Sequence, residues 1–339
     1  MKDKYRAAGV DIEAGEAAVE RIKTLVNANQ HPNILQGIGG FGGLYELPIS
    51  GMKRPVMVSS IDGVGTKLKV AFMMNQHHTI GQDLVNHCIN DILVQGARPL
   101  FFLDYIGTGH LNPEVISEIV EGITISCRAY QCALLGGETA EMPGFYQNNE
   151  YDIAGCIVGL VDYDQVITGQ KICPGNVMLG LPSNGLHTNG YSLARRALFE
   201  EAGLEIDTPI PEYSQTLGKI LLTPHRCYLP EIEPILSKGW INGMAHITGG
   251  GFIGNIKRIL PANVSAHVQT RNWNPPPIFN LIQKSGSISQ AEMYDVFNMG
   301  IGMVIVADTN HADLIQQELP ESVLIGRIES GNKQVINHY

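Results

Sequence analysis

Residues that suit a metal-bound polyphosphate gather in one short segment, SSIDGVGTKLK at 59–69. It follows a predicted strand and supplies a carboxylate, two glycines, a hydroxyl and a lysine, namely Asp62, Gly63, Gly65, Thr66 and Lys67. The carboxylate can hold Mg²⁺, the glycine amides can approach phosphate oxygens, and the lysine can neutralise their charge. The spacing matches neither the GxxxxGK[ST] of the nucleotide-binding P-loop nor a GxGxxG after a strand. The segment therefore predicts a polyphosphate site without naming the compound.

Further carboxylates can complete such a site. Asp83 and Asp91 are eight residues apart, close to two helical turns, so they can share one face of a helix expected at 83–94. Acidic residues on a helix are more often simply solvated, although apolar neighbours make plain exposure less favourable here. A glycine-rich loop expected after a strand at 132–135 carries Gly136, Gly137, Glu138 and Glu141. Several carboxylates next to glycine turns are typical of Mg–ATP sites.

A second glycine-rich segment, GIGGFGG, has five glycines in seven positions, namely Gly37, Gly39, Gly40, Gly42 and Gly43. So many glycines cannot hold a regular element, and they allow close approach of the backbone to a ligand. The segment follows a Pro–Asn turn instead of a strand, so a surface loop without a ligand is the alternative.

Two motifs in the second half place polar residues at expected helix starts. HTNGYS supplies His187, Thr188, Asn189 and Ser192, and HITGGG supplies His246, Thr248, Gly249, Gly250 and Gly251. Helix N-termini bind anions through free N–H groups and the helix dipole. The alternatives are an ordinary Asn189 cap with a surface histidine, and a packed or capping His246. Other histidines, such as His77, His78 and His338, lack ligand spacing and are expected at the surface.

Composition narrows the class of protein. The 339 residues are 44% hydrophobic and carry a formal net charge of −10, which disfavours nucleic acid as a partner. The nearest approach to a membrane span, 239–256, is interrupted by polar residues and glycines. The N-terminus has no apolar signal region, and the six cysteines form no CxxC pair. We therefore expect a cytoplasmic protein with reduced thiols, with no membrane and no nucleic-acid partner.

The chain alternates predicted strands and helices, which favours an α/β layered fold. In the first half, Asp11 is expected to cap a helix that ends near 27–32, Asn112 to start another, and strands are expected at 55–61, 99–104, 132–135 and 152–161. A turn-rich segment near 168–174 predicts a boundary between domains at 1–170 and 171–339. In the second half, strands are expected at 177–181 and 301–307, helices at 225–237 and 253–260, and a capping box at 289–292.

Read together, these motifs resemble the phosphoribosylformylglycinamidine cyclo-ligase family, the AIR synthetases of purine biosynthesis. The likeness runs from YxxAGVDIxAG at Tyr5 through GIGGFGGLYELP, DGVGTKLKVA, GGETAEMPGFY, HTNGYSLAR and HITGGGFIGNI to IGRI at 325–328. It implies two α/β domains and a homodimer in which two N-terminal sheets meet in a barrel-like arrangement. It also implies ATP- and Mg²⁺-dependent ring closure of formylglycinamidine ribonucleotide (FGAM) to 5-aminoimidazole ribonucleotide (AIR), and leaves open whether K⁺ is needed.

The resemblance implies a role for each residue singled out above. Asp62 and Asp91 would be Mg²⁺ ligands, with Glu138 near the metal or the substrate. ATP would contact two basic residues, Lys67 and Lys23. It would also contact Thr66 and the glycines of three segments, namely Gly37, Gly39, Gly40, Gly42, Gly43, Gly63, Gly65, Gly136 and Gly137. The substrate phosphate or the second side of the cleft would be held by His187, Thr188, Asn189, Ser192, Thr248 and Gly249 to Gly251. His246 would serve as acid, base or hydrogen-bond donor.

The chain departs from the family in one segment, and two other readings compete with it. Family members often have basic residues before the glycine loop, where this chain has NANQH at 27–31. Lys23 is therefore the nearest basic candidate for a contact to the nucleotide. One rival is another ATP-dependent member of the superfamily: selenophosphate synthetase, thiamine-monophosphate kinase or the FGAM-forming synthetase. Selenophosphate synthetase usually needs a reactive cysteine or selenocysteine near the N-terminal glycine loop, but the first cysteine here is Cys88. The other rival, a non-catalytic nucleotide-binding or dimerisation module, has no need of the carboxylates. Neighbouring pathway enzymes are expected as transient partners.

Overall fold

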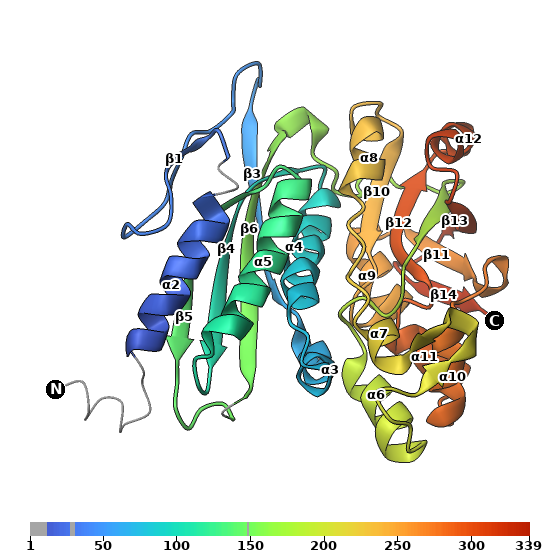
Figure 1. Cartoon of the computed structure of the whole chain (residues 1–339). Helices are drawn as coiled ribbons and strands as arrows, with labels where there is room; N and C mark the ends of the chain where they lie inside the picture. Colours follow the sequence, from blue (N-terminus) through green and yellow to red (C-terminus); the bar gives the residue numbers. More distant parts are fainter. Residues whose placement is uncertain (1–11, 28–30, 148) are drawn as a thin grey trace. The chain divides into compact units, whose positions relative to one another are not determined.

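The computed structural model describes residues 12–27, 31–147 and 149–339, which form two compact units. Unit 1 consists of Met1–Ile92 with Arg98–Leu160, and unit 2 of Leu93–Ala97 with Val161–Tyr339. Each unit contains one main sheet with helices packed on it (Figure 1). The mixed α/β fold expected from the sequence is therefore confirmed. The proposed capping residue Asp11 lies outside the described residues, as do the start of the family likeness at Tyr5 and residues 28–30.

Unit 1 is built on a four-stranded sheet. Its strands, in spatial order, are β3 (Pro55–Gly63), β6 (Tyr151–Asp162), β4 (Arg98–Thr108) and β5 (Ala133–Glu141). β4 runs parallel to β5 and antiparallel to β6. The expectation that GGETAE forms a loop is wrong, because β5 continues through it. Gly137 pairs with Asp104, and a Cβ on Gly137 would lie 2.4 Å from the Oδ1 atom of Asp104, so glycine lets this ladder continue beside a carboxylate.

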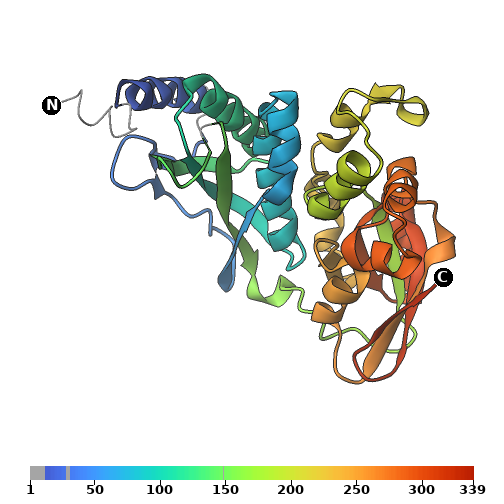
Figure 2. The same ribbon diagram turned by 90° about the horizontal axis from the view of Figure 1, so that it is seen from below.

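Three long helices cover one face of this sheet, α2 (Ile12–Asn27), α5 (Pro113–Ala129) and α4 (His78–Leu93), and they lie side by side (Figures 1 and 2). The predicted start of α5 is confirmed, because the Asn112 side chain accepts hydrogen bonds from the amides of Glu114 and Val115 at 2.9 and 3.4 Å. α4 and α5 approach closely through glycines: a Cβ on Gly122 would lie 1.9 Å from a carbonyl oxygen of α4. The short helix α3 (Leu68–Met74) joins β3 to α4.

The opposite face of the sheet is apolar and solvent-exposed. Side chains alternate along a strand, and those on this face include Met57 and Ile61 of β3, exposed by 59% and 71%, and Leu103 and Tyr105 of β4. A small two-stranded ribbon of β1 (Ile34–Gln36) and β2 (Leu44–Tyr45) carries the glycine loop between its strands.

Unit 2 contains a six-stranded sheet. The order is β10 (Ile241–His246), β12 (Ile301–Ala307), β7 (Val177–Pro182), β13 (Val323–Ser330), β11 (Val264–Gln269) and β14 (Val335–His338). All pairs are antiparallel except β11 with β14. The two strands expected from the sequence are central ones, and every residue of β12 is buried. The other four were not anticipated.

The helices of unit 2 are α6 (Tyr191–Arg195), α7 (Leu217–Leu221), α8 (Leu229–Leu236), α9 (Gly251–Ile259), α10 (Pro277–Ser285), α11 (Gln290–Val296) and α12 (Thr309–Glu318), and a short ribbon pairs β8 (Pro209–Ile210) with β9 (Gln215–Thr216). Ser289 caps α11 as expected. Two expectations need correction: the helix expected at 225–237 begins only at Leu229, and Asn189 does not cap α6. Gly190 does, with φ of 79°, where a Cβ would lie 2.3 Å from the Phe297 ring. No described helix is long and apolar enough to cross a membrane.

Candidate active site

The end of β3 and the middle of α4 bring two of the predicted carboxylates together. Asp62 is the next-to-last residue of β3, and α4 carries His87 and Asp91 one helical turn apart. The Nε2 atom of His87 lies 2.8 Å from Oδ2 of Asp62 and 3.8 Å from Oδ2 of Asp91. The Ser60 hydroxyl donates to Asp91 at 3.1 Å, and the Gly63 amide donates to Asp62 at 2.7 Å. Both carboxylates are thus held in place from the protein side while remaining partly exposed.

His87 and the carboxylates of Asp62 and Asp91 each favour the charged form of the other through their electrostatic attraction. Burial by itself would lower the pKa of His87, but its hydrogen bond to Asp62 and the nearby charges of Asp91, Asp62 and Asp83 outweigh burial and raise that pKa. Partial burial would raise the pKa of Asp62, but the hydrogen bond and charge of His87, with the Gly63 amide, bring the pKa below its usual value. Asp62 is therefore ionised at neutral pH, as a cation ligand must be.

Lys67 is buried and paired. It ends the 3-10 helix Gly65–Lys67, and its ammonium lies 2.9 and 2.8 Å from the two carboxylate oxygens of Asp83 on α4, with both side chains fully buried. Burial lowers the pKa of Lys67, and the charge of Asp83 opposes that change. Because the ammonium points into the interior of unit 1, its predicted contact with a triphosphate gains no support from this geometry.

Glu138 lies apart from the Asp62 cluster. β5 is separated from β3 by two strands, which at the usual strand spacing corresponds to about 14 Å. Glu138 pairs with Tyr105 and shares the exposed apolar face of the sheet. Glu141, at the end of β5, accepts a hydrogen bond from the Leu111 amide at 2.7 Å and an ion pair from His110 at 3.0 Å. It therefore fixes the turn before α5.

The glycine loop and the side chain of Lys23 lie close together. The Cε atom of Lys23 is 3.9 Å from the position of a Cβ on Gly39, whose φ of 115° favours glycine. A Cβ on Gly43 would lie 2.4 Å from the Leu135 side chain, so glycine is needed where the loop crosses β5. The Lys23 ammonium is held by Glu20 at 2.8 Å.

In unit 2, the HITGGG turn forms the start of α9. Gly250 and Gly251 have φ of 89° and 54°, and a Cβ on Gly251 would lie 1.9 Å from the carbonyl oxygen of Tyr294. The buried Asn255 amide donates to the carbonyl oxygens of Gly251, Thr248 and Gly249 at 2.8, 3.2 and 3.4 Å. The turn is thereby held by three hydrogen bonds from one side chain, and it presents the amide end of a helix, which favours an anion.

The HTNGYS turn lies against the HITGGG turn. A Cβ on Gly249 would be 3.2 Å from Oδ1 of Asn189, and the Asn189 amide is 3.4 Å from the Thr188 hydroxyl. His187 has φ of 63°, a left-handed conformation that is uncommon outside glycine. Ser192 is exposed in the first turn of α6. The predicted phosphate-binding residues of the two motifs therefore lie next to one another within unit 2.

Three buried histidines join beside these turns: His187, His225 and His246, with exposures of 2%, 1% and 6%. The Nε2 atoms of His225 and His246 are 3.0 Å apart, and the His187 ring stacks on the His225 ring at a centroid distance of 4.0 Å. The Nδ1 atom of His225 lies 3.3 Å from the Thr188 hydroxyl.

Comparison with known proteins decides the family. Residues 49–161 match the N-terminal domain of AIR synthase related proteins, and residues 173–338 match the C-terminal domain. A phosphoribosylformylglycinamidine cyclo-ligase from Trichlorobacter lovleyi is 51% identical over 333 residues, covering 97% of this chain and 95% of that protein. One from Alkaliphilus oremlandii is 50% identical over 340 residues, covering 99% and 100%. The chain belongs to the phosphoribosylformylglycinamidine cyclo-ligase family.

Two solved structures of proteins with other names share the fold of this chain. A thiamine-monophosphate kinase from Stenotrophomonas maltophilia has a TM-score of 0.69 at 18% identity, covering 95% of both chains. The hydrogenase maturation protein HypE in complex with ATP has a TM-score of 0.65 at 17% identity, covering 94% of this chain and 90% of that one. At such identities the likeness establishes the shared fold alone.

Three residues that contact the predicted site residues were missed from the sequence. His87 could have been found, because it stands four residues from both Asp83 and Asp91 on one helix. Asn255 carried a weaker signal, four residues after Gly251 on α9. His225 carried none, since only the fold brings it to His246. The expectation of surface histidines holds for His78 and His338 and is wrong for His77, His87 and His225, which are buried.

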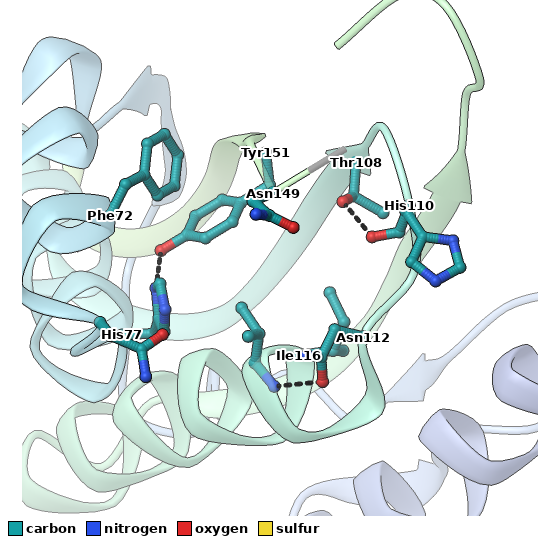
Figure 3. Close-up of a pocket in the computed structure, with 10 residues that line it drawn as sticks. Phe72, His77, Thr108, His110, Asn112, Ile116, Asn149 and Tyr151 are labelled. Atoms are coloured by element: carbon teal, nitrogen blue, oxygen red, sulfur yellow. Dashed lines mark hydrogen bonds between the residues drawn. The ribbon is translucent and has the colours of Figure 1, made fainter. Parts of the chain in front are cut away.

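A cavity of about 280 Å³ lies elsewhere in unit 1, between α3, the start of α5 and the ends of β4 and β6 (Figure 3). None of the predicted site residues lines it. Its buried polar groups bond to one another: His77 to the Tyr151 hydroxyl at 3.0 Å, and the Thr108 hydroxyl to the His110 carbonyl at 2.9 Å. These two buried groups therefore already have partners within unit 1.

Proposed function

We propose that this chain catalyses the ATP-dependent closure of the imidazole ring of AIR from FGAM, with release of ADP and phosphate, in de novo purine biosynthesis. The observation that carries this proposal is identity of about half of all residues, over nearly the full length, to proteins named for this reaction. The paired carboxylates of unit 1 and the rigid glycine turn of unit 2 support it, since the reaction needs a metal-bound nucleotide and a ribonucleotide phosphate site.

The chemistry asks the protein mainly for positioning and charge neutralisation. ATP transfers its terminal phosphoryl group to the formyl oxygen of FGAM, which turns a poor leaving group into a good one. The amidine-side nitrogen attacks the activated carbon, the ring closes, and phosphate departs with the former formyl oxygen. One proton must leave the attacking nitrogen, and His246, in the turn that would hold the substrate, is the proposed acid or base.

Asp62 and Asp91 fit a Mg²⁺ ion. Their carboxylates come from two different elements, both reach solvent, and oxygen ligands of this kind are those that Mg²⁺ prefers. When bound, the ion would neutralise phosphate charge. His87 and Ser60 orient the two carboxylates from the protein side. Glu138 lies on the opposite edge strand, so we keep it as a candidate contact to substrate.

The nucleotide would contact the glycine loop at 37–43, the turn at 63–66 and Lys23. Lys67 would hold Asp83 and thereby the junction between β3 and α4. The substrate phosphate would bind at the Gly249–Gly251 turn, where the Asn255 amide donates to three carbonyl oxygens and the amide end of α9 would face the anion. His187, Thr188, Asn189 and Ser192 would border the same place.

We propose that two copies pair through the exposed face of the unit 1 sheet, as the barrel-like dimer of the family implies. Support comes from apolar side chains on neighbouring strands, with Ile61 exposed by 71% and Met57 by 59%, since large exposed apolar patches mark interaction surfaces. None of the six cysteines forms a disulfide bond, which supports a reducing cytoplasm. Transient contacts with neighbouring pathway enzymes stay a prediction.

The test is incubation with FGAM, ATP and Mg²⁺ while AIR is followed by diazo coupling and phosphate is followed in parallel. Equal appearance of AIR and phosphate is the expected result. Phosphate without AIR would point to another acceptor and to a different member of the superfamily. Neither product, with ATP still bound, would favour a non-catalytic module.

A further inference from the structure

His225 touches three of the residues predicted to hold or transform the substrate. It lies between α7 and α8, and its side chain is 1% exposed. One ring nitrogen faces His246, the other faces Thr188, and the ring stacks on His187. A side chain so buried cannot reach a substrate in solution, so any effect on the reaction must pass through these neighbours.

The 3.0 Å separation of the two Nε2 atoms fixes how hydrogens are placed. At that distance one nitrogen must donate a hydrogen and the other must offer a lone pair. If the Nε2 of His225 donates, its Nδ1 accepts from the Thr188 hydroxyl. If it accepts, its Nδ1 donates to the same hydroxyl at 3.3 Å. The tautomer of His246 and the orientation of the Thr188 hydroxyl are therefore coupled through one ring.

A metal site is the alternative interpretation of His187, His225 and His246, because one nitrogen of each ring lies within 4.8 Å of the other two. A tetrahedral zinc site has Zn–N bonds of about 2.0–2.1 Å, so its nitrogens are about 3.4 Å apart with lone pairs converging on one point. The rings of His187 and His225 are stacked with an interplanar angle of 25°, so their in-plane lone pairs do not converge. The arrangement favours hydrogen bonding over metal binding.

We propose that His225 is a positioning residue that sets the tautomer of His246 and the orientation of the Thr188 hydroxyl for ring closure. The inference rests on the proposed function, because it assigns His246 the acid–base step. Whichever of the two rings donates, the Nε2 atom of His246 is engaged by His225, so that the tautomer of His246 follows that of His225. It also links the HTNGYS turn to the HITGGG turn, so that phosphate binding and proton transfer share one rigid support.

Two substitutions separate this role from packing. His225→Leu fills a similar volume but removes both hydrogen bonds, whereas His225→Gln retains an amide that can bond toward His246. We expect His225→Leu to lower kcat/KM for FGAM about 10–100-fold, the range seen when orienting partners are removed, and His225→Gln to recover a large part of it. Long-range ¹⁵N–¹H NMR of His246 should show one tautomer in the wild type and a mixture in His225→Leu.

The control is His338→Leu, which removes another histidine pair of unit 2, between His267 on β11 and the exposed His338 on β14, at 2.9 Å. It should leave kcat, KM and the His246 spectrum unchanged. A folded His225→Leu protein with wild-type kcat, KM and His246 tautomer would overturn the proposal, as would Zn²⁺ binding that needs all three histidines. If the wild type made no AIR, the proposed function would fail, while the NMR comparison would still test the coupling.

Discussion

Replacing Gly251 by alanine tests whether the turn at the start of α9 requires a residue without a side chain. The added Cβ would lie 1.9 Å from the Tyr294 carbonyl oxygen, and φ is 54°. A left-handed backbone costs an L-residue about 1–2 kcal/mol, and overpacking typically adds about 1–3 kcal/mol. The expected loss of unfolding free energy is therefore about 2–5 kcal/mol.

Gly254→Ala is the matched control, because it makes the same change three residues later on the same helix. Gly254 has nothing within 4 Å of its added Cβ, so helix propensity should stabilise the protein by about 0.5–1 kcal/mol. The two variants should thus shift stability in opposite directions.

Tryptophan fluorescence during urea unfolding measures this effect in the right unit. The chain has two tryptophans, Trp240 and Trp273, and both belong to unit 2. Gly251→Ala should also raise KM for FGAM, since it moves the helix amides proposed to hold the phosphate. A change below about 0.5 kcal/mol, the usual size of surface effects, or equal shifts in both variants, would refute the reasoning.

Three further outcomes are expected from unit 1. Lys67→Met should cost about 3–5 kcal/mol, because it leaves the Asp83 carboxylate buried without a cation; combining it with Asp83→Leu should recover most of that loss in circular-dichroism unfolding curves. Asp104→Asn should stabilise the protein at pH 8 and not at pH 4, because burial raises the folded-state pKa of Asp104 to about 7 while the unfolded value is about 3.9. The folded wild type binds the extra proton between these values, so its stability falls as pH rises through them. Ile61→Lys should shift the protein toward monomer in sedimentation velocity, because it puts a charge into the proposed dimer face.

Each of these has a result that would contradict it. A double variant as unstable as Lys67→Met alone would show that the lost stability does not come from an unpaired charge. If the difference in unfolding free energy between Asp104→Asn and the wild type did not change with pH, ionisation of buried Asp104 would not be the cause of the effect. Ile125→Lys on the solvent side of α5, where Ile125 is 47% exposed, is the control for Ile61→Lys. Equal dissociation by both would argue against the sheet face.

The sequence predicted the framework of unit 1 because its signals are local. The cap at Asn112 and the apolar strands at 55–61 and 152–161 depend on residues within a few positions of one another. The prediction of a loop at GGETAE was wrong. Adjacent glycines are typical of loops, but Gly137 is a glycine because the Asp104 side chain on the neighbouring strand leaves no room for a Cβ atom. Local sequence patterns indicate the backbone conformation that a residue favours. They do not indicate which side chain of another strand packs against it.

Unit 2 and its site show the same limit. The fully buried strand β12 was predicted, whereas β11, β13 and β14 are short or partly exposed. Among the candidate site residues, Asp62 and Asp91 meet because a strand end and a helix face carry them there. His225 and His246 meet only through tertiary packing, 21 residues apart with α8 between them.

The central claim is that ring closure proceeds through phosphorylation of the formyl oxygen, and isotope transfer tests it most directly. FGAM labelled with ¹⁸O in the formyl group is converted with ATP and Mg²⁺, and the released phosphate is examined by mass spectrometry. The account predicts one ¹⁸O atom in each phosphate for each AIR formed. Unlabelled phosphate with AIR still produced would contradict it, because the formyl oxygen would then have left by another route.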